Sequence, residues 1–170
     1  SSYGIDCDSS LLELIQTLHE IDGIERIRLG SLEPGIITES FVQALVKLPK
    51  VCPHFHLSLQ SGSGTVLKRM NRRYTPEEYL EKCDLLRQYY EHPAITTDII
   101  VGFPGETEED FEETMDVVRK VRYDSAFTFI YSKRTGTPAA SMEEQVPEDV
   151  IKARFDRLLK EVQKISAEKA

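Results

Sequence analysis

Polar and apolar side chains alternate along residues 54–60, the stretch whose residue types and spacing best suit binding chemistry. Successive side chains of a β-strand point to opposite faces, so the alternation gives one polar and one apolar face. The polar face carries His54, His56, Ser58 and Gln60, and the apolar face carries Phe55, Leu57 and Leu59. In a barrel surrounded by helices the apolar face packs under the helices, and the polar face then lines the interior where a ligand binds.

The two histidines of the polar face could hold a metal ion, because imidazole is a common metal ligand. A metal site needs further ligands, and no third one lies close to His54 and His56 in the sequence. The pattern therefore favours histidines that are hydrogen-bonded or face a substrate, and we predict no metal site.

Asp98 places a carboxylate inside the apolar run 95–101. A carboxylate at that depth is tolerated only when it is hydrogen-bonded or paired with a cation. Asp98 therefore either binds donor groups of a ligand or forms a structural pair with an interior cation such as Arg28. The sequence leaves both alternatives open.

A turn with two glycines, residues 101–105, follows this run and leads into a helix that begins near Glu106. Such a turn delivers backbone N–H groups to a helix start, which suits an anion or a closely packed cofactor ring. Many loops need two glycines merely to turn, so this signal is weak by itself. The pair Gly62 and Gly64 is not a phosphate loop, since no Gly-Lys-Ser/Thr sequence follows it.

Aromatic side chains alternate along residues 127–131. The period of two places Phe127, Phe129 and Tyr131 on one face of a strand. We expect Phe127 and Phe129 to pack in the core, and Tyr131, at the end of the strand, to be functional.

A basic cluster follows the glycines and comprises Lys68, Arg69, Arg72 and Arg73. The cluster either binds phosphate or forms a solvated surface at a helix start, balanced by Glu77 and Glu78. The net charge of -8 argues against a nucleic-acid binder that acts alone, because such proteins gain affinity by neutralising phosphates.

Composition is typical of one globular domain with a sizeable core: 40% of the 170 residues are hydrophobic and 29% are charged. No apolar run approaches the roughly 20 residues of a membrane helix, and the first residues do not resemble a signal peptide, so we expect a cytoplasmic protein with no membrane partner. The cysteines Cys7, Cys52 and Cys83 are too scattered to form a disulfide framework or a zinc or iron–sulfur ligand set.

Extended apolar runs alternate with amphipathic helices along the whole chain. We expect strands at 26–29, 55–59, 95–101 and 126–131, and helices around 11–18, 41–48, 79–86, from 106 onward and from 147 onward. Thr38 and Thr75 supply helix N-caps, and Pro76 suits a first turn. This alternation predicts an α/β fold of parallel βα units, either an open doubly wound sheet or a partial (β/α) barrel.

Ligands of both architectures bind at the carboxyl ends of the strands. The residues predicted at this rim are Ser2, Tyr3 and Gly4, then Ser31, Glu33 and Pro34, then Gln60 and Ser61, then 98–105, and finally 131–134.

Four ordered motifs carry a family resemblance. They are RIRLGSLEP at 26–34, HLSLQSGSGTVLKRMNRRYTPEEY at 56–79, TTDIIVGFPGETEEDFEET at 96–114, and the loop from Tyr131 to Ala139. Together they resemble the radical S-adenosylmethionine methylthiotransferases over essentially the whole chain. The SLEP form of the first of these motifs is more similar to the branch that acts on N6-threonylcarbamoyladenosine in tRNA than to the isopentenyladenosine or ribosomal-protein branches. Gly64 departs from the family, which more often has an acidic residue there.

The resemblance implies a partial (β/α) barrel that binds S-adenosylmethionine at a 4Fe-4S cluster, with tRNA as the substrate of the full-length enzyme. The CxxxCxxC motif of the family is absent from this sequence, and the three cysteines cannot replace it. The resemblance thus implies a single, incomplete barrel core at 1–170, truncated at its N-terminal strand and cluster loop, and inactive alone.

Site residues follow from the same resemblance, matched motif by motif. Cofactor contacts are expected from Tyr3, Gly4, Gln60, Ser61, Asp98, Gly102 and Phe103. Further rim groups that could hold the substrate or the methionine carboxylate are Arg28, Glu33, Arg69, Tyr131 and Arg134. No catalytic residue is assigned.

Two other functional classes stay open. The first is an aldolase-type barrel enzyme, which would need a Schiff-base lysine or a metal cluster at the strand ends, and neither is evident. The second is a binding or scaffold module without catalysis. An opened barrel would also expose a strand edge, through which the chain could form a homodimer.

Overall fold

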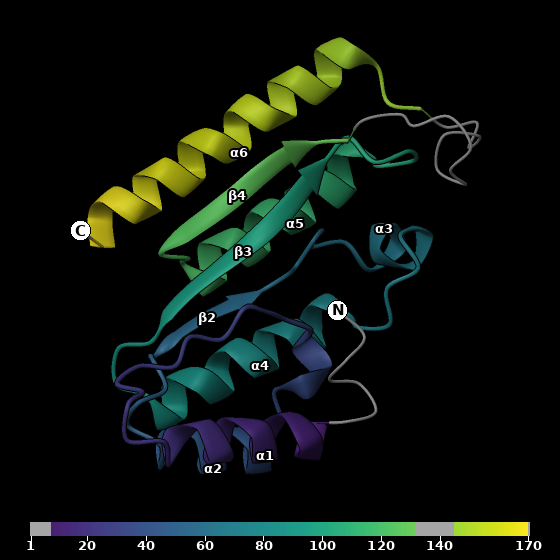
Figure 1. Cartoon of the computed structure of the whole chain (residues 1–170). Helices are drawn as coiled ribbons and strands as arrows, with labels where there is room; N and C mark the ends of the chain where they lie inside the picture. Colours follow the sequence, from purple (N-terminus) through teal and green to yellow (C-terminus); the bar gives the residue numbers. More distant parts are fainter. Residues whose placement is uncertain (1–7, 132–144, 170) are drawn as a thin grey trace.

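The computed structural model describes residues 8–131 and 145–169 (Figure 1). Its elements in chain order are α1 (Asp8–His19), β1 (Ser31–Leu32), the 3-10 helix η2 (Pro34–Ile36), α2 (Glu39–Val46), β2 (His54–Leu57), α3 (Gly64–Arg69), α4 (Pro76–Tyr89), β3 (Ala94–Val101), α5 (Glu108–Val121), β4 (Ser125–Ile130) and α6 (Glu148–Lys169). Among these described helices, none has the length and apolarity needed to cross a membrane.

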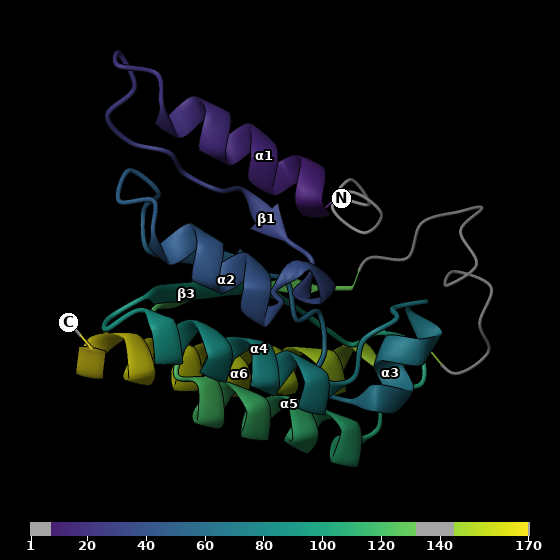
Figure 2. The same ribbon diagram turned by 90° about the horizontal axis from the view of Figure 1, so that it is seen from below.

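The four strands form one parallel sheet in the order β1-β2-β3-β4. This order follows the sequence without the reversal that defines a doubly wound sheet. Helices α4, α5 and α6 lie on the same side of the sheet, as the view from below shows (Figure 2). The α/β prediction is therefore confirmed, and the strand order favours the partial barrel over the doubly wound sheet.

Threonine and serine side chains start the helices where the sequence predicts starts. Thr38, Thr75 and Thr107 each accept a hydrogen bond from the backbone N–H three residues later. Pro76 occupies the first turn of α4, where a missing N–H costs nothing. Successive helices then pack side by side in the series α1, α2, α4, α5 and α6.

Two predicted strands differ from the observed ones. The first was expected at 26–29, but Ile27 forms only an isolated bridge with Val51, and the strand lies at Ser31–Leu32. The second was expected to continue to residue 59, but β2 ends at Leu57, and beyond it only Gln60 forms an isolated bridge, with Ile99.

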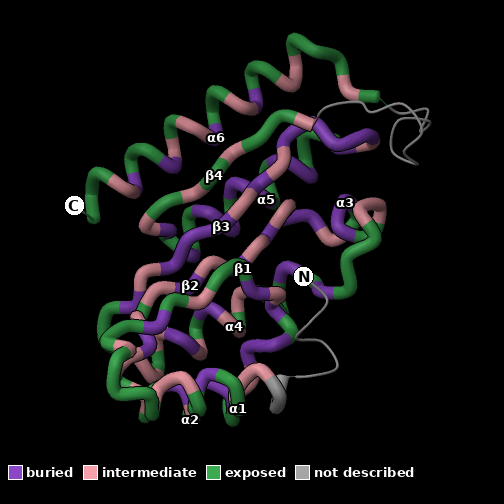
Figure 3. The backbone as a smooth tube through the Cα atoms, in the orientation of Figure 1, coloured by how far each residue is buried: buried purple, intermediate pink, exposed green. Residues whose placement is uncertain are grey.

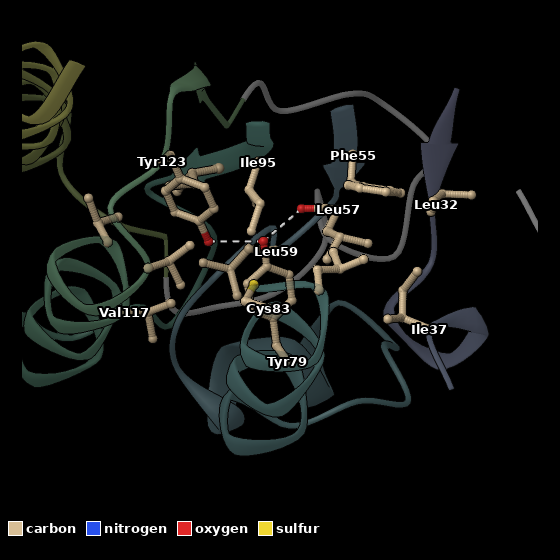
Figure 4. Close-up of a cluster of buried hydrophobic side chains, with 14 of the residues drawn as sticks. Leu32, Ile37, Phe55, Leu57, Leu59, Tyr79, Cys83, Ile95, Val117 and Tyr123 are labelled. Atoms are coloured by element: carbon tan, nitrogen blue, oxygen red, sulfur yellow. Dashed lines mark hydrogen bonds between the residues drawn. The ribbon is translucent and has the colours of Figure 1, made fainter. Parts of the chain in front are cut away.

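The hydrophobic core lies between the sheet and the helices (Figure 4). Phe55, Leu57 and Leu59 are fully buried, as the alternation predicts. A hydroxyl chain crosses this core: Tyr123 donates to the Tyr79 hydroxyl at 3.0 Å, and Tyr79 donates to the Leu57 carbonyl at 2.8 Å. These bonds satisfy buried polar atoms and fix the end of β2 against α4.

The other face of the sheet is open, and the polar face of residues 54–60 lies on it. Along β2 the side chains of this face are half-buried, whereas the alternate side chains on the helix side are buried (Figure 3). Phe127 and Phe129 are 56% and 51% exposed. The expectation that these rings pack in the core is wrong, because no described helix covers their face of β4.

Candidate functional site

Gln60 ends the extended run of residues 54–60 with a backbone kink. Its φ is 67°, in the left-handed region that residues other than glycine rarely adopt. Two backbone bonds hold the kink: the Gln60 N–H donates to the Asp98 carbonyl at 2.8 Å, and the Ile100 N–H donates to the Gln60 carbonyl at 2.9 Å. Gln60 thus lies beside the carboxyl-terminal half of β3, and the chain turns away from the sheet immediately after it.

Asp98 is bound by neighbours on the open face. The His56 Nε2 lies 3.1 Å from Asp98 Oδ2, and the Ser58 hydroxyl donates to the same oxygen at 3.4 Å. On its other side, His56 Nδ1 lies 2.8 Å from the Thr96 hydroxyl. Of the two alternatives for Asp98, the pair with Arg28 is not formed: Arg28 is exposed, and the described partners of Asp98 are His56 and Ser58.

The loop after Gln60 is bound to helix α5 rather than open to a ligand. The Ser61 side chain is fully buried, and its hydroxyl accepts from the Ser63 N–H at 3.1 Å. The Gly62 N–H donates to the Thr114 hydroxyl at 2.9 Å, and the Ser63 hydroxyl donates to Asp110 Oδ1 at 2.7 Å. Any ligand contact from Ser61 must therefore come from its backbone.

Asp110 also closes the start of α5, because it accepts from the Thr107 N–H at 2.9 Å. Burial raises the pKa of Asp110, but hydrogen bonds from Thr107 and Ser63 and the charge of Arg69 outweigh it, so the pKa lies below its ordinary value. Asp110 thus joins two helix caps, those of α3 and α5.

We expect Asp110→Asn to reduce stability by about 1 kcal/mol at pH 7, and by less at lower pH. A carboxyl whose pKa is depressed by folding contributes stability above its unfolded pKa and loses that contribution as the pH falls through the folded pKa. Urea unfolding at pH 7 and near pH 3 measures this, with the exposed Asp116→Asn as the control. If the free energies of unfolding of wild type and Asp110→Asn differed equally at both pH values, the lowered pKa of Asp110 would be contradicted.

The turn at 101–105 binds a carboxylate of the chain itself. The Gly102 N–H donates to Glu106 Oε1 at 3.1 Å, and Arg154 of α6 donates to the same oxygen at 2.9 Å. Glu106 and Arg154 are both buried, and burial raises the pKa of Glu106 despite these bonds. The anion that the Gly102 N–H binds is thus the Glu106 side chain of the chain itself. The ion pair between Glu106 and Arg154 attaches α6 to the end of β3.

Aromatic rings meet at the carboxyl ends of β3 and β4. The rings of Phe103 and Tyr131 are 5.4 Å apart and nearly perpendicular. The Tyr131 hydroxyl is buried and has no hydrogen-bond partner within the described part of the chain. Next to them, Arg69 donates to the Pro104 carbonyl at 3.2 Å.

The basic cluster is divided between two surroundings. Arg69 faces the turn at Pro104, whereas Lys68, Arg72 and Arg73 line a groove of about 730 Å³ together with acidic residues of α4 and α5. These acids are Glu77, Glu112, Glu113 and Asp116. Arg72 also lies 3.9 Å from Glu33. Because acidic residues share the groove, these three cations fit a solvated surface with balanced charge better than a phosphate site.

The remaining sequence-predicted residues are outside the described part of the chain, namely Tyr3, Gly4 and Arg134. Sequence reasoning missed Glu106, Arg154 and Thr114, which hold the rim loops in place. The acidic residue directly after the glycine turn was the one available signal for Glu106, whereas nothing in the sequence paired it with Arg154, 48 residues away.

Cys52 and Cys83, the two cysteines in the described part of the chain, do not form a cluster site. Cys83 is buried in the core, and burial raises the pKa of its thiol to about 12, which disfavours the thiolate that binds metals. The described residues contain no group of three or more His, Cys, Asp or Glu side chains that could hold a metal ion.

The polar and aromatic groups thus gather at the carboxyl ends of parallel strands. Comparison with known proteins agrees with this arrangement, because residues 4–118 match the model of a family described as the Radical SAM superfamily. The chain belongs to the radical SAM superfamily. As a radical SAM fold, it is similar to coproporphyrinogen III oxidase from Escherichia coli, with a TM-score of 0.73 at 18% identity over 93% of this chain and 37% of that one. A radical S-adenosylmethionine methyltransferase from Kitasatospora setae is similar with a TM-score of 0.65 at 17% identity, over 82% of this chain and 28% of that one.

Several curated relatives of this radical SAM chain carry the name tRNA-2-methylthio-N(6)-dimethylallyladenosine synthase. The chain is 51% identical to the protein from Acetivibrio thermocellus over 99% of this chain and 35% of the relative. It is 52% identical to that from Clostridium tetani over 96% of this chain and 37% of the relative. The chain therefore spans about a third of the length of these relatives. Their names do not favour the threonylcarbamoyladenosine branch that the SLEP motif indicates.

Proposed function

We propose that this chain is the barrel core of a radical SAM methylthiotransferase that modifies N6-dimethylallyladenosine in tRNA. The observation that carries the proposal is that Gln60, Gly102 and Phe103 lie at the carboxyl ends of adjacent strands in a chain half-identical to synthases of that name. Isopentenyladenosine and dimethylallyladenosine are two names for the same nucleoside. We therefore propose this nucleoside as the substrate instead of threonylcarbamoyladenosine. Homology at this level also favours an enzyme over a scaffold module for the parent protein.

S-adenosylmethionine with a 4Fe-4S cluster supplies the radical chemistry of this superfamily. The described residues do not fit the cluster, since Cys83 of α4 is buried and Cys52 lies in the segment between α2 and β2. They do fit S-adenosylmethionine at the mouth of the barrel, which is the rim formed by the carboxyl ends of the strands. There the buried Tyr131 hydroxyl has no partner among the described residues, and aromatic rings flank the turn at Gly102. We therefore assign Gln60, Gly102 and Phe103 to orient the cofactor, with Ser61 contributing its backbone.

The partner proposed for the full enzyme is tRNA. No observation supports the expected homodimer, and the edge strand β1 has only two residues, so it offers few backbone groups for pairing. Dimerisation is therefore not part of the proposal.

Isothermal calorimetry of S-adenosylmethionine with this chain tests the proposal. We expect binding that weakens about tenfold in Gln60→Gly, because the side chain is lost while glycine keeps the left-handed backbone without strain. Asn71→Gly is the matched control, since Asn71 also has a positive φ of 62° and is exposed. Equal affinity in wild type and Gln60→Gly, or no binding to the wild type, would contradict a cofactor site at this mouth.

A further inference from the structure

Two phenyl rings on the open face of the sheet are exposed to an unusual degree. Phe127 and Phe129 of β4 are each about half exposed, and the strand register places them opposite Asp98 and Ile100 of β3. Large aromatic side chains that stay exposed side by side on one face of a sheet mark a surface that an apolar group covers.

A hydrogen-bond acceptor lies directly beside these rings. Asp98 Oδ2 contacts His56 and Ser58, whereas Asp98 Oδ1 has no hydrogen bond or ion pair to the part of the chain that the structure describes. The His56 ring is held by Thr96 and lies 5.9 Å from the ring of Phe127. One carboxylate oxygen is thus fixed by the protein, and the other is available to a donor on a ligand that touches the rings.

We propose that Asp98, Phe127 and Phe129 form the subsite that reads the N6 substituent of the adenine to be modified. Asp98 Oδ1 accepts the single N6–H of an N6-alkylated adenine, and the two rings pack against its five-carbon alkyl chain. This inference rests on the proposed function and deepens it, because it assigns the choice of substrate to named residues.

Charge excludes the competing tRNA base from the same subsite. A threonylcarbamoyl group carries a carboxylate, which Asp98 would repel at close range. Within the described residues, Asp98 makes no ion pair with a lysine or arginine that would neutralise it. An unmodified adenine could donate to Asp98, but it would leave both rings uncovered.

The test titrates this chain with N6-dimethylallyladenosine, adenosine and N6-threonylcarbamoyladenosine, and saturation-transfer NMR measures the binding of each. We expect the dimethylallyl compound to bind at least about ten times more tightly than the other two, because only it buries a chain of five carbons against the rings. Equal binding of adenosine would mean that the face reads adenine alone and would overturn the proposal. Tightest binding of the threonylcarbamoyl compound, or no binding of any of them, would overturn it as well.

Variants then locate the site. Phe127→Ser, Phe129→Ser and Asp98→Asn are each expected to weaken binding of N6-dimethylallyladenosine about tenfold. Ile130→Ser is the matched control, because Ile130 is 47% exposed on the same strand and points to the opposite face. If a variant unfolds, intermolecular NOEs from the dimethylallyl methyl protons to phenylalanine rings of the wild type decide the question, and their absence contradicts the proposal.

Failure of this inference is distinguishable from failure of the proposed function. Loss of nucleoside discrimination with intact binding of S-adenosylmethionine would remove the subsite but leave the cofactor-binding core. If S-adenosylmethionine binding did not depend on Gln60 but the chain still discriminated among the nucleosides, the cofactor site would be removed and the nucleoside subsite would remain.

Discussion

Replacing Gly62 by alanine is expected to destabilise the chain by about 3 kcal/mol, at the upper end of what overpacking costs. A Cβ at this position would lie 2.5 Å from the Thr114 Cα and 2.8 Å from the Glu113 carbonyl oxygen. Both atoms belong to the backbone of α5, which cannot rotate away as a side chain can. The loop would therefore have to leave the helix, breaking the hydrogen bond from the Gly62 N–H to Thr114.

Gly64→Ala provides the matched control for this prediction. A Cβ at Gly64 would meet only Pro76, at 3.8 Å, and Gly64 begins α3. Alanine is the better helix former, so the variant should be neutral or slightly more stable. Denaturant unfolding of both variants measures the difference. A Gly62→Ala protein as stable as the wild type would show that the loop does not need its contact with α5.

Arg154→Met is expected to cost about 3–5 kcal/mol, because it leaves the buried Glu106 carboxylate without its counter-charge. Arg154 Nη1 donates to both the side chain and the backbone carbonyl of Glu106, each at 2.9 Å. Side-chain exposures of 7% for Arg154 and 1% for Glu106 leave little room for water to replace the lost partner. We expect α6 to lose its attachment to the end of β3 first.

Arg157→Met is the control, three residues further along the same helix. Arg157 contacts Glu108 and Glu112 but is exposed, and exposed ion pairs contribute about 0–1 kcal/mol. The double variant Glu106→Gln with Arg154→Met should recover part of the loss, because it removes the unpaired charge. Thermal unfolding of wild type, Glu106→Gln, Arg154→Met and their double variant, followed by circular dichroism, gives the coupling between Glu106 and Arg154. Equal losses in Arg154→Met and Arg157→Met would contradict the role of the buried pair.

Much of the fold was predictable because its signals are local. Alternation along residues 54–60 identified β2 and its buried face, and Thr75 with Pro76 located the start of α4. The strand at 26–29 failed for a physical reason. A pattern of alternating residues predicts which side each side chain faces, but the ladder also needs a partner in register, and Ile27 finds only Val51.

The candidate site was predictable in its position but not in its partners. Strand ends can be read from the sequence, and they located Gln60 and Gly102 just beyond β2 and β3. Pairing across the sheet cannot be read in the same way, so the sequence suggested Arg28 as a partner of Asp98, whereas the structure shows His56. The exposure of Phe127 and Phe129 also depends on what covers the face of β4, and a pattern within one strand holds no information about a covering layer.

The strand order has a consequence for how the chain folds during synthesis. Each strand pairs with the strand made just before it, so each new ladder can form as soon as the next strand and its helix have left the ribosome. No strand has to wait for a distant partner, and loop closure between successive strands stays short compared with a sheet whose neighbours are far apart in sequence. Because Arg154 reaches the Glu106 carboxylate only after α6 has been synthesised, the ion pair that attaches α6 to the end of β3 forms later than the pairing of β3 with β4 can begin.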